Sequence, residues 1–445
     1  MPPDSTNLLQ QISHLDQTFI YQLIILITAI VGAITGVISV TRKSRSKQNQ
    51  KRITSTLEQK FSYSYFPQYA TEAATAYYIK PNCSTHDPAQ VKEEDIRWLL
   101  RQSLFEVIDN FLKSNPKYRH LYILGDSGIG KSSFVLNYFV RNYQRAEKDQ
   151  CHLIIMPLAD PELENWIESI ADQENTVLFL DGFDEDTKAI DDPTRRFADL
   201  IKLCKRFDRL LITSRSQFFP NDEAIQRETH IRRYVPGAGE SSDWEFEIRY
   251  LLPFSDQQAR DFLRHHYPIW LFFRRRRAFR LMKQIPALSM RPMLLYHIPD
   301  LINRKQTIRF TFELYEEMIK AWFIREKRWV DPEALREFSE QLAVEIYSKR
   351  EERQAEWIHY SELLPLAQNW NIDLQTWKLR SRSLLNRSDP QGNYKFAHRS
   401  IMEYLFVKRL LDGAFKYSSL QRTDQMNIFL YEMLKSRHST ISQND

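Results

Sequence analysis

The chain has 445 residues, of which 42% are hydrophobic and 27% charged, and this balance describes a globular protein with enough apolar material for more than one core. Its formal net charge of only +5 argues against a polyanion-binding protein as a whole, so nucleic acid is not an expected partner. Three widely separated cysteines argue against a disulfide framework and against a zinc site with C-x-x-C spacing.

An uncharged, apolar stretch runs from Gln17 to Thr41. As a helix its 25 residues would measure about 37 Å, which is enough to cross a hydrocarbon core of about 30 Å. No Lys or Arg precedes Arg42, whereas six lie between Arg42 and Arg52, so the positive-inside rule places the N-terminus outside and the remainder in the cytoplasm. We therefore expect a single-pass protein of the cell (inner) membrane.

Beyond the basic run, apolar residues at three- and four-residue spacing predict an amphipathic helix from Val91 to Ser114. Short apolar runs then alternate with helical stretches, a pattern typical of a parallel sheet covered on both faces. The predicted strands are HLYILG (120–125), HLIIMPLA (152–159), TVLFLD (176–181), RLLITSR (209–215) and FEIRYLLPF (246–254). The sequence thus predicts an α/β fold with a central parallel sheet.

The stretch LYILGDSGIGKSS (121–133) holds three of the ten glycines in the chain. It matches G-x-x-x-x-G-K-[ST], follows a predicted strand and opens a helix, which is the context of a phosphate-binding loop. Its glycines let successive N–H groups face a phosphate, and the helix adds its positive N-terminal end. Lys131 would reach the β- and γ-phosphates, and the Ser132 hydroxyl would bind Mg²⁺. The predicted nucleotide-binding residues of the loop are Gly125, Asp126, Ser127, Gly128, Ile129, Gly130, Lys131, Ser132 and Ser133.

A second motif, LFLDGFDE, ends the predicted strand at 176–181 with a cluster of carboxylates. We predict that Asp181 holds Mg²⁺ through water, together with Ser132, and that Asp184 and Glu185 lie where a carboxylate can polarise an attacking water. Arg215 ends a neighbouring strand, where it can sense or stabilise the charge of a γ-phosphate. Asp184, Glu185 and Arg215 are therefore the predicted catalytic residues.

These three motifs, in this order, resemble the NACHT branch of the signal-transducing (STAND) NTPases, which includes bacterial defence proteins. The resemblance covers about residues 95–411 and leaves out the membrane segment and the linker. Its further parts are YLLPFSDQQARDFL (250–263) for the first helical domain, LSMRPMLLYHIPDLI (288–302) for the leucine-rich segment, FTFELYEEMIKAWFIRE (310–326) for the start of a winged helix, and LLNRSDPQGNYKFAHRSIMEYLFVKRL (384–410) for its wing and last helix. The resemblance implies that Pro292 lies against the adenine and that His398 contacts the β-phosphate of bound ADP.

The resemblance also implies the domain order, with all-helical and winged-helix domains after the P-loop NTPase domain. The expected segments are an extracytoplasmic N-terminus (1–18), a transmembrane helix (19–41), a basic juxtamembrane linker (42–90), the NACHT NTPase domain (91–253), a helical domain (254–305), a winged-helix domain (306–411) and a short helical C-terminal tail (412–445).

The function that this order implies is a slow ATPase that uses ATP or ADP with Mg²⁺ as a switch and forms homo-oligomers on activation. Its trigger would be an unknown ligand or partner protein, and its transmembrane helix would act as the effector in antiphage defence. Two alternatives stay open: a constitutive membrane-anchored ATPase that remodels its targets, and a scaffold that binds nucleotide without hydrolysing it.

One basic run, FFRRRRAFR (272–280), is not explained by these motifs. We expect a solvated helical face whose aromatic side chains pack inward. The alternative is a contact with phosphates of nucleic acid or of lipid headgroups, and the expected cytoplasmic position favours anionic lipid among these.

Overall fold

The computed structural model describes residues 78–88, 91, 95–113, 119–219, 232–233, 245–284, 290–303, 310–389, 391–413 and 420–441. They belong to one compact unit, which comprises residues 65–67 and 77–445. The predicted N-terminal segment (1–18), the transmembrane helix (19–41) and most of the juxtamembrane linker (42–90) lie outside the described residues. Within the described ranges, no helix combines the length and the apolar character that crossing a membrane requires.

Among the described residues, eight strands form one largely parallel sheet in the order β2–β1–β8–β3–β6–β5–β4, with β7 paired to β8. The pairs that join β3, β4, β5, β6, β7 and β8 are parallel, and β1 runs antiparallel to β8 and to β2. The strands are β1 (Asn82–Ser84), β2 (Gln102–Ser103), β3 (His120–Leu124), β4 (His152–Pro157), β5 (Thr176–Asp181), β6 (Arg209–Ser214), β7 (Arg232–Arg233) and β8 (Glu245–Leu251).

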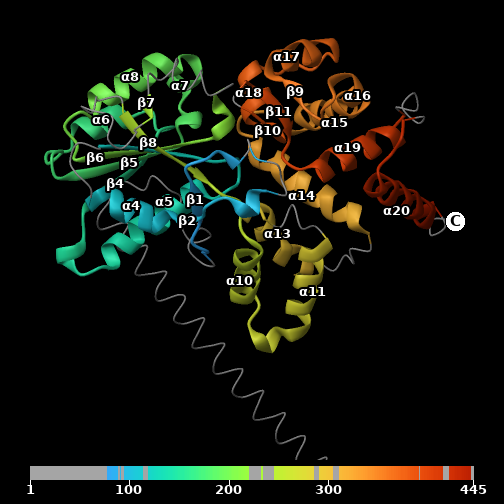
Figure 1. The fold of residues 1–445 in the computed structure, drawn as a ribbon, viewed down its shortest axis with the longest axis horizontal. Helices are drawn as coiled ribbons and strands as arrows, with labels where there is room; N and C mark the ends of the chain where they lie inside the picture. Colours follow the sequence, from blue (N-terminus) through green and yellow to red (C-terminus); the bar gives the residue numbers. More distant parts are fainter. Residues whose placement is uncertain are drawn as a thin grey trace, which may run out of the picture. The chain divides into compact units, whose positions relative to one another are not determined.

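Helices cover both faces of this sheet. Figure 1 shows α6, α7 and α8 on one face and α4 and α5 on the other. This arrangement explains why β5 and β6 are buried along their whole length and read as continuous apolar runs. The helices here are α4 (Leu104–Lys113), α5 (Lys131–Gln144), η3 (Glu147–Asp149), α6 (Leu163–Glu168), η4 (Phe183–Glu185), α7 (Thr187–Asp191), α8 (Pro193–Leu203) and η5 (Ser216–Phe218).

All five predicted strands are present, the last one ending at Leu251 rather than at Phe254. The predicted helix at 91–114 is wrong in its first part, because its helical stretch begins only at Leu104. Before it, η2 (Ile96–Trp98) is a single 3-10 turn, and β2 extends the sheet by pairing with β1. Pairing at the sheet edge therefore overrides the helical spacing of the apolar residues in this segment.

The chain after β8 is helical and shares one hydrophobic core that extends from Phe254 to Met433. A three-stranded antiparallel sheet, in the order β10–β11–β9, lies within it. Its elements are α10 (Asp256–His266), η6 (Ile269–Leu271), α11 (Phe272–Gln284), α13 (Pro292–Asn303), α14 (Thr311–Glu326), α15 (Pro332–Ser348), α16 (Arg350–Arg353), β9 (Ile358–His359), α17 (Tyr360–Asn369), α18 (Thr376–Ser381), β10 (Leu385–Arg387), β11 (Asn393–Phe396), α19 (Arg399–Leu411) and α20 (Asp424–Ile441). Residues 310–413 are called the C-terminal region below.

The fold is thus α/β, with a central, largely parallel sheet followed by helical regions. The predicted domain boundaries, and the assignment of residues 306–411 to a winged helix, stay predictions. Within that range, the β10–β11 hairpin and α19 lie in the stretch that the resemblance assigns to a wing and a last helix.

Candidate nucleotide site

The predicted phosphate-binding loop connects the end of β3 to the start of α5. Gly128 (φ 72°) and Gly130 (φ 101°) have left-handed backbone conformations, which side chains other than glycine rarely adopt. A Cβ atom at Gly128 would also lie 2.9 Å from the Cβ of Met293 and 2.9 Å from Nη1 of Arg325. Gly128 is therefore required both by the turn and by the close approach of the helices that cover the loop.

Lys131 and Ser132 follow Gly130 and form the first two residues of α5. Lys131 Nζ donates to the carbonyl oxygens of Gly125 (2.7 Å) and Asp126 (3.1 Å), and burial lowers its pKa to about 8. Burial raises the pKa of Asp181, while hydrogen bonds from the hydroxyls of Ser132 and Thr213 act against this rise. A serine hydroxyl next to a carboxylate at a strand end suits the oxygen ligands that Mg²⁺ prefers. The structure thus brings the predicted Mg²⁺ pair, Ser132 and Asp181, together.

The third predicted motif, Arg215, follows β6, which lies between β3 and β5. Its backbone N–H donates to Asp184 Oδ1 (2.9 Å), and its Nε lies 2.9 Å from Asp184 Oδ2. The other end of the guanidinium reaches the C-terminal region: Nη2 pairs with Glu326 Oε1 (3.1 Å), and Nη1 donates to the carbonyl of Ser381 (2.7 Å). Arg215 therefore joins the acidic motif to the C-terminal region.

Arg382 of the C-terminal region and Ser127 of the phosphate-binding loop complete a buried charge network with these residues. Arg382 Nη2 donates to the carbonyl of Asp184 (2.7 Å), and its Nη1 lies 3.5 Å from Glu326 Oε2. Ser127 of the phosphate-binding loop donates to Glu326 Oε1 (3.2 Å). Asp184, Arg215, Glu326 and Arg382, called the ionic network below, are all at most 4% exposed. Two cations and two carboxylates balance there, and Ser127 connects them to the loop.

The two predicted water-polarising carboxylates differ in their surroundings. Burial opposes ionisation of Asp184, but Arg215 and Arg382 hold its pKa below the usual range. Burial and the neighbouring Asp184 raise the pKa of Glu185. A general base works best when its pKa approaches the working pH, so Glu185 is the better placed of the two for that role in this conformation, whereas Asp184 is engaged in ion pairs.

A second set of contacts converges on Asp126 in the loop. Its carboxylate accepts hydrogen bonds from Ser216 Oγ (3.0 Å) and Asn386 Nδ2 (2.6 Å), and it pairs with Arg291 Nη2 (3.3 Å). These partners come from η5, from β10 and from the residue before α13. The side chain of Asp126, predicted to bind nucleotide, thus joins the loop to the helical regions.

Arg291 has a second property that suits a phosphate site. Its side chain is 7% exposed, and within the described part of the chain its Nη1 has no hydrogen-bond partner. Because its Nη2 contacts Asp126 of the loop, an unused donor on a buried cation lies beside the phosphate-binding loop. Planar guanidinium groups match phosphate oxygens well.

The two residues that the resemblance assigned to bound nucleotide also lie near the loop. Pro292 begins α13, and the N–H of the following Met293 donates to the carbonyl of Gly128 (3.2 Å). Arg291, which immediately precedes α13, donates to the carbonyl of Ala397 (3.3 Å), and Ala397 precedes His398. The contacts therefore bring Pro292 to the loop and His398 to the arginine that touches it.

His398 caps the N-terminus of α19. Its Nδ1 accepts the N–H of Ser400 (3.0 Å) and lies 2.7 Å from Ser400 Oγ, which itself accepts from Tyr315 (2.8 Å). Burial, Arg291 and Lys395 lower the His398 pKa to about 4, so the ring is neutral at pH 7. With Nδ1 accepting, we assign the ring proton to Nε2, which makes Nε2 a donor.

The sequence did not predict Arg291, Glu326, Arg382 or Asn386 as parts of this site. Glu326 carried one usable signal, since it follows Met318 and Trp322 at four-residue intervals on the buried face of α14. A carboxylate at a core position of an amphipathic helix requires a buried partner. No local pattern marks the other three, because their partners are far away in the sequence.

No protein-family model matches the chain, and no curated protein matches it. Among solved structures, the chain is similar to a Signal Transduction ATPase with Numerous Domains (STAND) protein with a tetratricopeptide repeat sensor from Pyrococcus horikoshii, at 14% identity and a TM-score of 0.27 over 70% of this chain and 44% of that one. It is also similar to a variant of Thermotoga maritima RuvB, at 11% identity and a TM-score of 0.33 over 71% of this chain and 95% of that one. The chain thus spans less than half of the length of the STAND protein.

Proposed function

We propose that the chain is a membrane-anchored NTPase of the NACHT type that uses bound ADP and ATP as the two states of a signalling switch. The ionic network carries this proposal. It engages the predicted catalytic Arg215 and Asp184 with Glu326 and Arg382 of the C-terminal region, and it is tied to the phosphate-binding loop through Ser127. An ATPase that turned over continuously would gain nothing from burying its catalytic arginine in such a contact.

The residues around the loop fit a nucleoside diphosphate with Mg²⁺. Lys131, the unused Nη1 of Arg291 and the Nε2–H of His398 are donors suited to phosphate oxygens, and Ser132 with Asp181 would hold the metal. Two of these donors, Arg291 and His398, come from the helical regions. A bound diphosphate would therefore stabilise the closed arrangement in which these regions cover the loop.

ATP would supply a γ-phosphate whose negative charge competes with Glu326 for Arg215. Without Arg215, Glu326 keeps its ion pair with Arg382 among the described residues, and the contact between the C-terminal region and the acidic motif weakens. In the proposed open state the NTPase units associate and bring their membrane helices together. Signalling in antiphage defence through that helix is part of the same proposal.

The first experiment is to extract the full chain in mild detergent, identify its co-purifying nucleotide and time ATP turnover on the same sample. We expect tightly held ADP and turnover on the order of one per minute or slower, well below the roughly 1–10³ per second of typical enzymes. Lys131→Ala should purify without nucleotide, whereas Lys188→Ala, an exposed lysine that pairs with Glu164, should retain it. An empty site with fast, steady turnover would contradict the switch and favour a constitutive ATPase.

A further inference from the structure

The tip of the α10–α11 pair exposes apolar side chains. Ile269, Phe272 and Phe273 are 74%, 56% and 86% exposed. The prediction that the aromatic residues of the basic run pack inward is therefore wrong for these two phenylalanines, although Phe279 does pack against the core. Figure 1 shows α10 and α11 side by side, and η6, which carries Ile269, connects them at one end. Contiguous exposed apolar side chains are a common feature of interaction sites.

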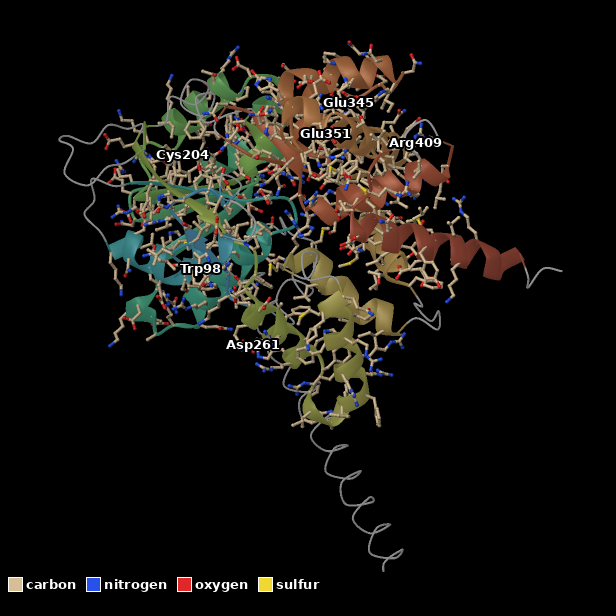
Figure 2. The ribbon with its side chains drawn as sticks, turned by 45° about the vertical axis from the view of Figure 1, so that its right-hand side comes forward. Trp98, Cys204, Asp261, Glu345, Glu351 and Arg409 are labelled. Carbon is tan, nitrogen blue, oxygen red and sulfur yellow. The ribbon has the colours of Figure 1, made fainter. Side chains whose placement is uncertain are left out.

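The same tip carries unbalanced positive charge. The 13 residues of α11 include Arg274, Arg275, Arg276, Arg277, Arg280 and Lys283 and no acidic residue. Within the described part of the chain, Arg274, Arg276 and Arg280 form no ion pair. The nearby acids of α10 are already used: Asp261, labelled in Figure 2, pairs with Arg264 at 2.9 Å, and Asp256 pairs with Arg260 at 3.5 Å. These arginines are therefore available to an anionic partner.

We propose that Ile269, Phe272, Phe273, Arg274, Arg276 and Arg280, called the α11 surface, dock on an anionic lipid bilayer. Guanidinium groups form charge-assisted hydrogen bonds with phosphates, and anionic headgroups supply phosphates in a plane. Phenylalanine and isoleucine side chains gain by entering the boundary between headgroups and acyl chains. The α11 surface combines both kinds of group within a few residues of one another.

Ile269 distinguishes lipid from nucleic acid as the partner. Single-stranded nucleic acid is bound by stacking bases on flat aromatic rings and by pairing phosphates with cations. The aliphatic side chain of Ile269 is 74% exposed and cannot stack on a base, whereas the acyl region of a bilayer would bury it favourably. The surface consists of described residues alone, so the inference does not depend on the predicted span at 19–41.

The test is amide hydrogen exchange of the full chain with nanodiscs of neutral phosphatidylcholine, or of phosphatidylcholine mixed with phosphatidylglycerol. We expect exchange in residues 264–284 to slow several-fold with the anionic discs only, and the effect to vanish at high salt because exposed charges are then screened. Equal exchange in both kinds of disc would overturn the proposal. Slowing by a single-stranded oligonucleotide, without slowing by anionic lipid, would overturn it in favour of nucleic acid.

Variants separate the two parts of the surface. Arg274→Glu with Arg276→Glu should abolish the slowing, and Phe272→Ser with Phe273→Ser should reduce it at equal charge. Arg206→Glu is the matched control, since its side chain is 69% exposed and lies near the end of α8, and it should leave the slowing intact. If the two-arginine variant keeps full protection, the proposal is wrong. Alkaline carbonate extraction of the same protein tests the predicted membrane span separately, so failure of the span and failure of the α11 surface can be told apart.

Discussion

Arginines occur in two contrasting settings in this molecule. Arg215, Arg291 and Arg382 are at most 5% exposed, and each lies within 3.5 Å of at least one carboxylate. Arg274 and Arg276 of α11 are exposed and, within the described residues, have no acidic partner. The first set connects the sheet to the regions that follow it, and the second faces outward. Arginine thus forms ion pairs inside the molecule in one place and is exposed to an external partner in the other.

Buried and exposed arginines differ in the free energy that a substitution costs. A buried pair contributes little net stability over an apolar contact of the same shape, but breaking it leaves an unpaired buried charge at a high cost. An exposed arginine costs almost nothing to change, because water solvates whatever replaces it. Buried arginines therefore fix one arrangement of the chain, whereas exposed ones can be selected for a partner.

The largest effect is expected at the centre of the ionic network. Glu326→Gln removes one of its two carboxylates and leaves Arg215 and Arg382 with Asp184 alone, so we expect a loss of about 3–5 kcal/mol in the free energy of unfolding. The measurement is denaturant unfolding of the purified protein. Glu333→Gln, at a glutamate whose side chain is 74% exposed, is the control and should change little.

A double variant sharpens this first result. Glu326→Leu with Arg382→Met removes one charge of each sign, so it should cost clearly less than the sum of its two single changes. Additive losses would mean that the two side chains do not interact, and the ionic network would then not hold the C-terminal region.

The next effect concerns His398 and the pH. Folded His398 has a pKa of about 4, against about 6.5 in an unfolded chain, so between these values the unfolded state binds the proton more readily. The free energy of unfolding should therefore fall as the pH is lowered from 6.5 to 4, by up to about 3 kcal/mol from this residue.

Comparison with His398→Asn isolates that contribution, because asparagine also caps a helix N-terminus but does not titrate. Buried carboxyls with raised pKa values, such as Glu185, act in the opposite direction over this range, so the quantity to measure is the difference between the two proteins. Parallel pH profiles for both would show that His398 is not protected from protonation in the folded state.

A smaller effect is expected where a neutral side chain meets the loop. Asn386→Ala removes the 2.6 Å hydrogen bond to Asp126 and should cost about 1–3 kcal/mol of unfolding free energy. If the contact holds the helical regions over the loop, the variant should also release bound ADP faster, measured by chase with unlabelled nucleotide. Asn175→Ala, in an exposed turn, is the control. Unchanged release together with lost stability would restrict Asn386 to a structural role.

The sequence predicted the sheet well because its signals are local. Apolar runs predicted the five strands, and glycine spacing predicted the tight loop after Leu124, whose binding of phosphate stays a prediction. The edge strand at Gln102–Ser103 was missed because its partner β1 is only three residues long and carries no alternating pattern. Pairing between two such short strands, which lie about 20 residues apart in the sequence, depends on the tertiary fold rather than on intrinsic β-propensity.

Only the part of the candidate site that lies in short sequence motifs could be predicted. Gly128, Lys131, Ser132 and Asp181 lie in short motifs, and the structure brings them together. Arg382 lies 198 residues after Asp184, whose carbonyl accepts its hydrogen bond, so no window of sequence contains that contact. The motifs therefore predict the chemistry of the site, whereas its closure depends on pairs that only the fold brings together.

The smallest effect on stability is expected at the α11 surface, where the contrast between the two sets of arginines is sharpest. Arg274→Glu with Arg276→Glu should change the free energy of unfolding by no more than about 0.5 kcal/mol, because both side chains are outside the core. The variant can even be slightly more stable, since a carboxylate at position 276 lies four residues before Arg280 on a helix whose native charged residues are all cations. Denaturant unfolding measures this in the same samples that are used for exchange with anionic nanodiscs. A loss of several kcal/mol would mean that these arginines support the fold as Arg382 does, and the exchange result would then have to be repeated with the two-phenylalanine variant, whose net charge is unchanged.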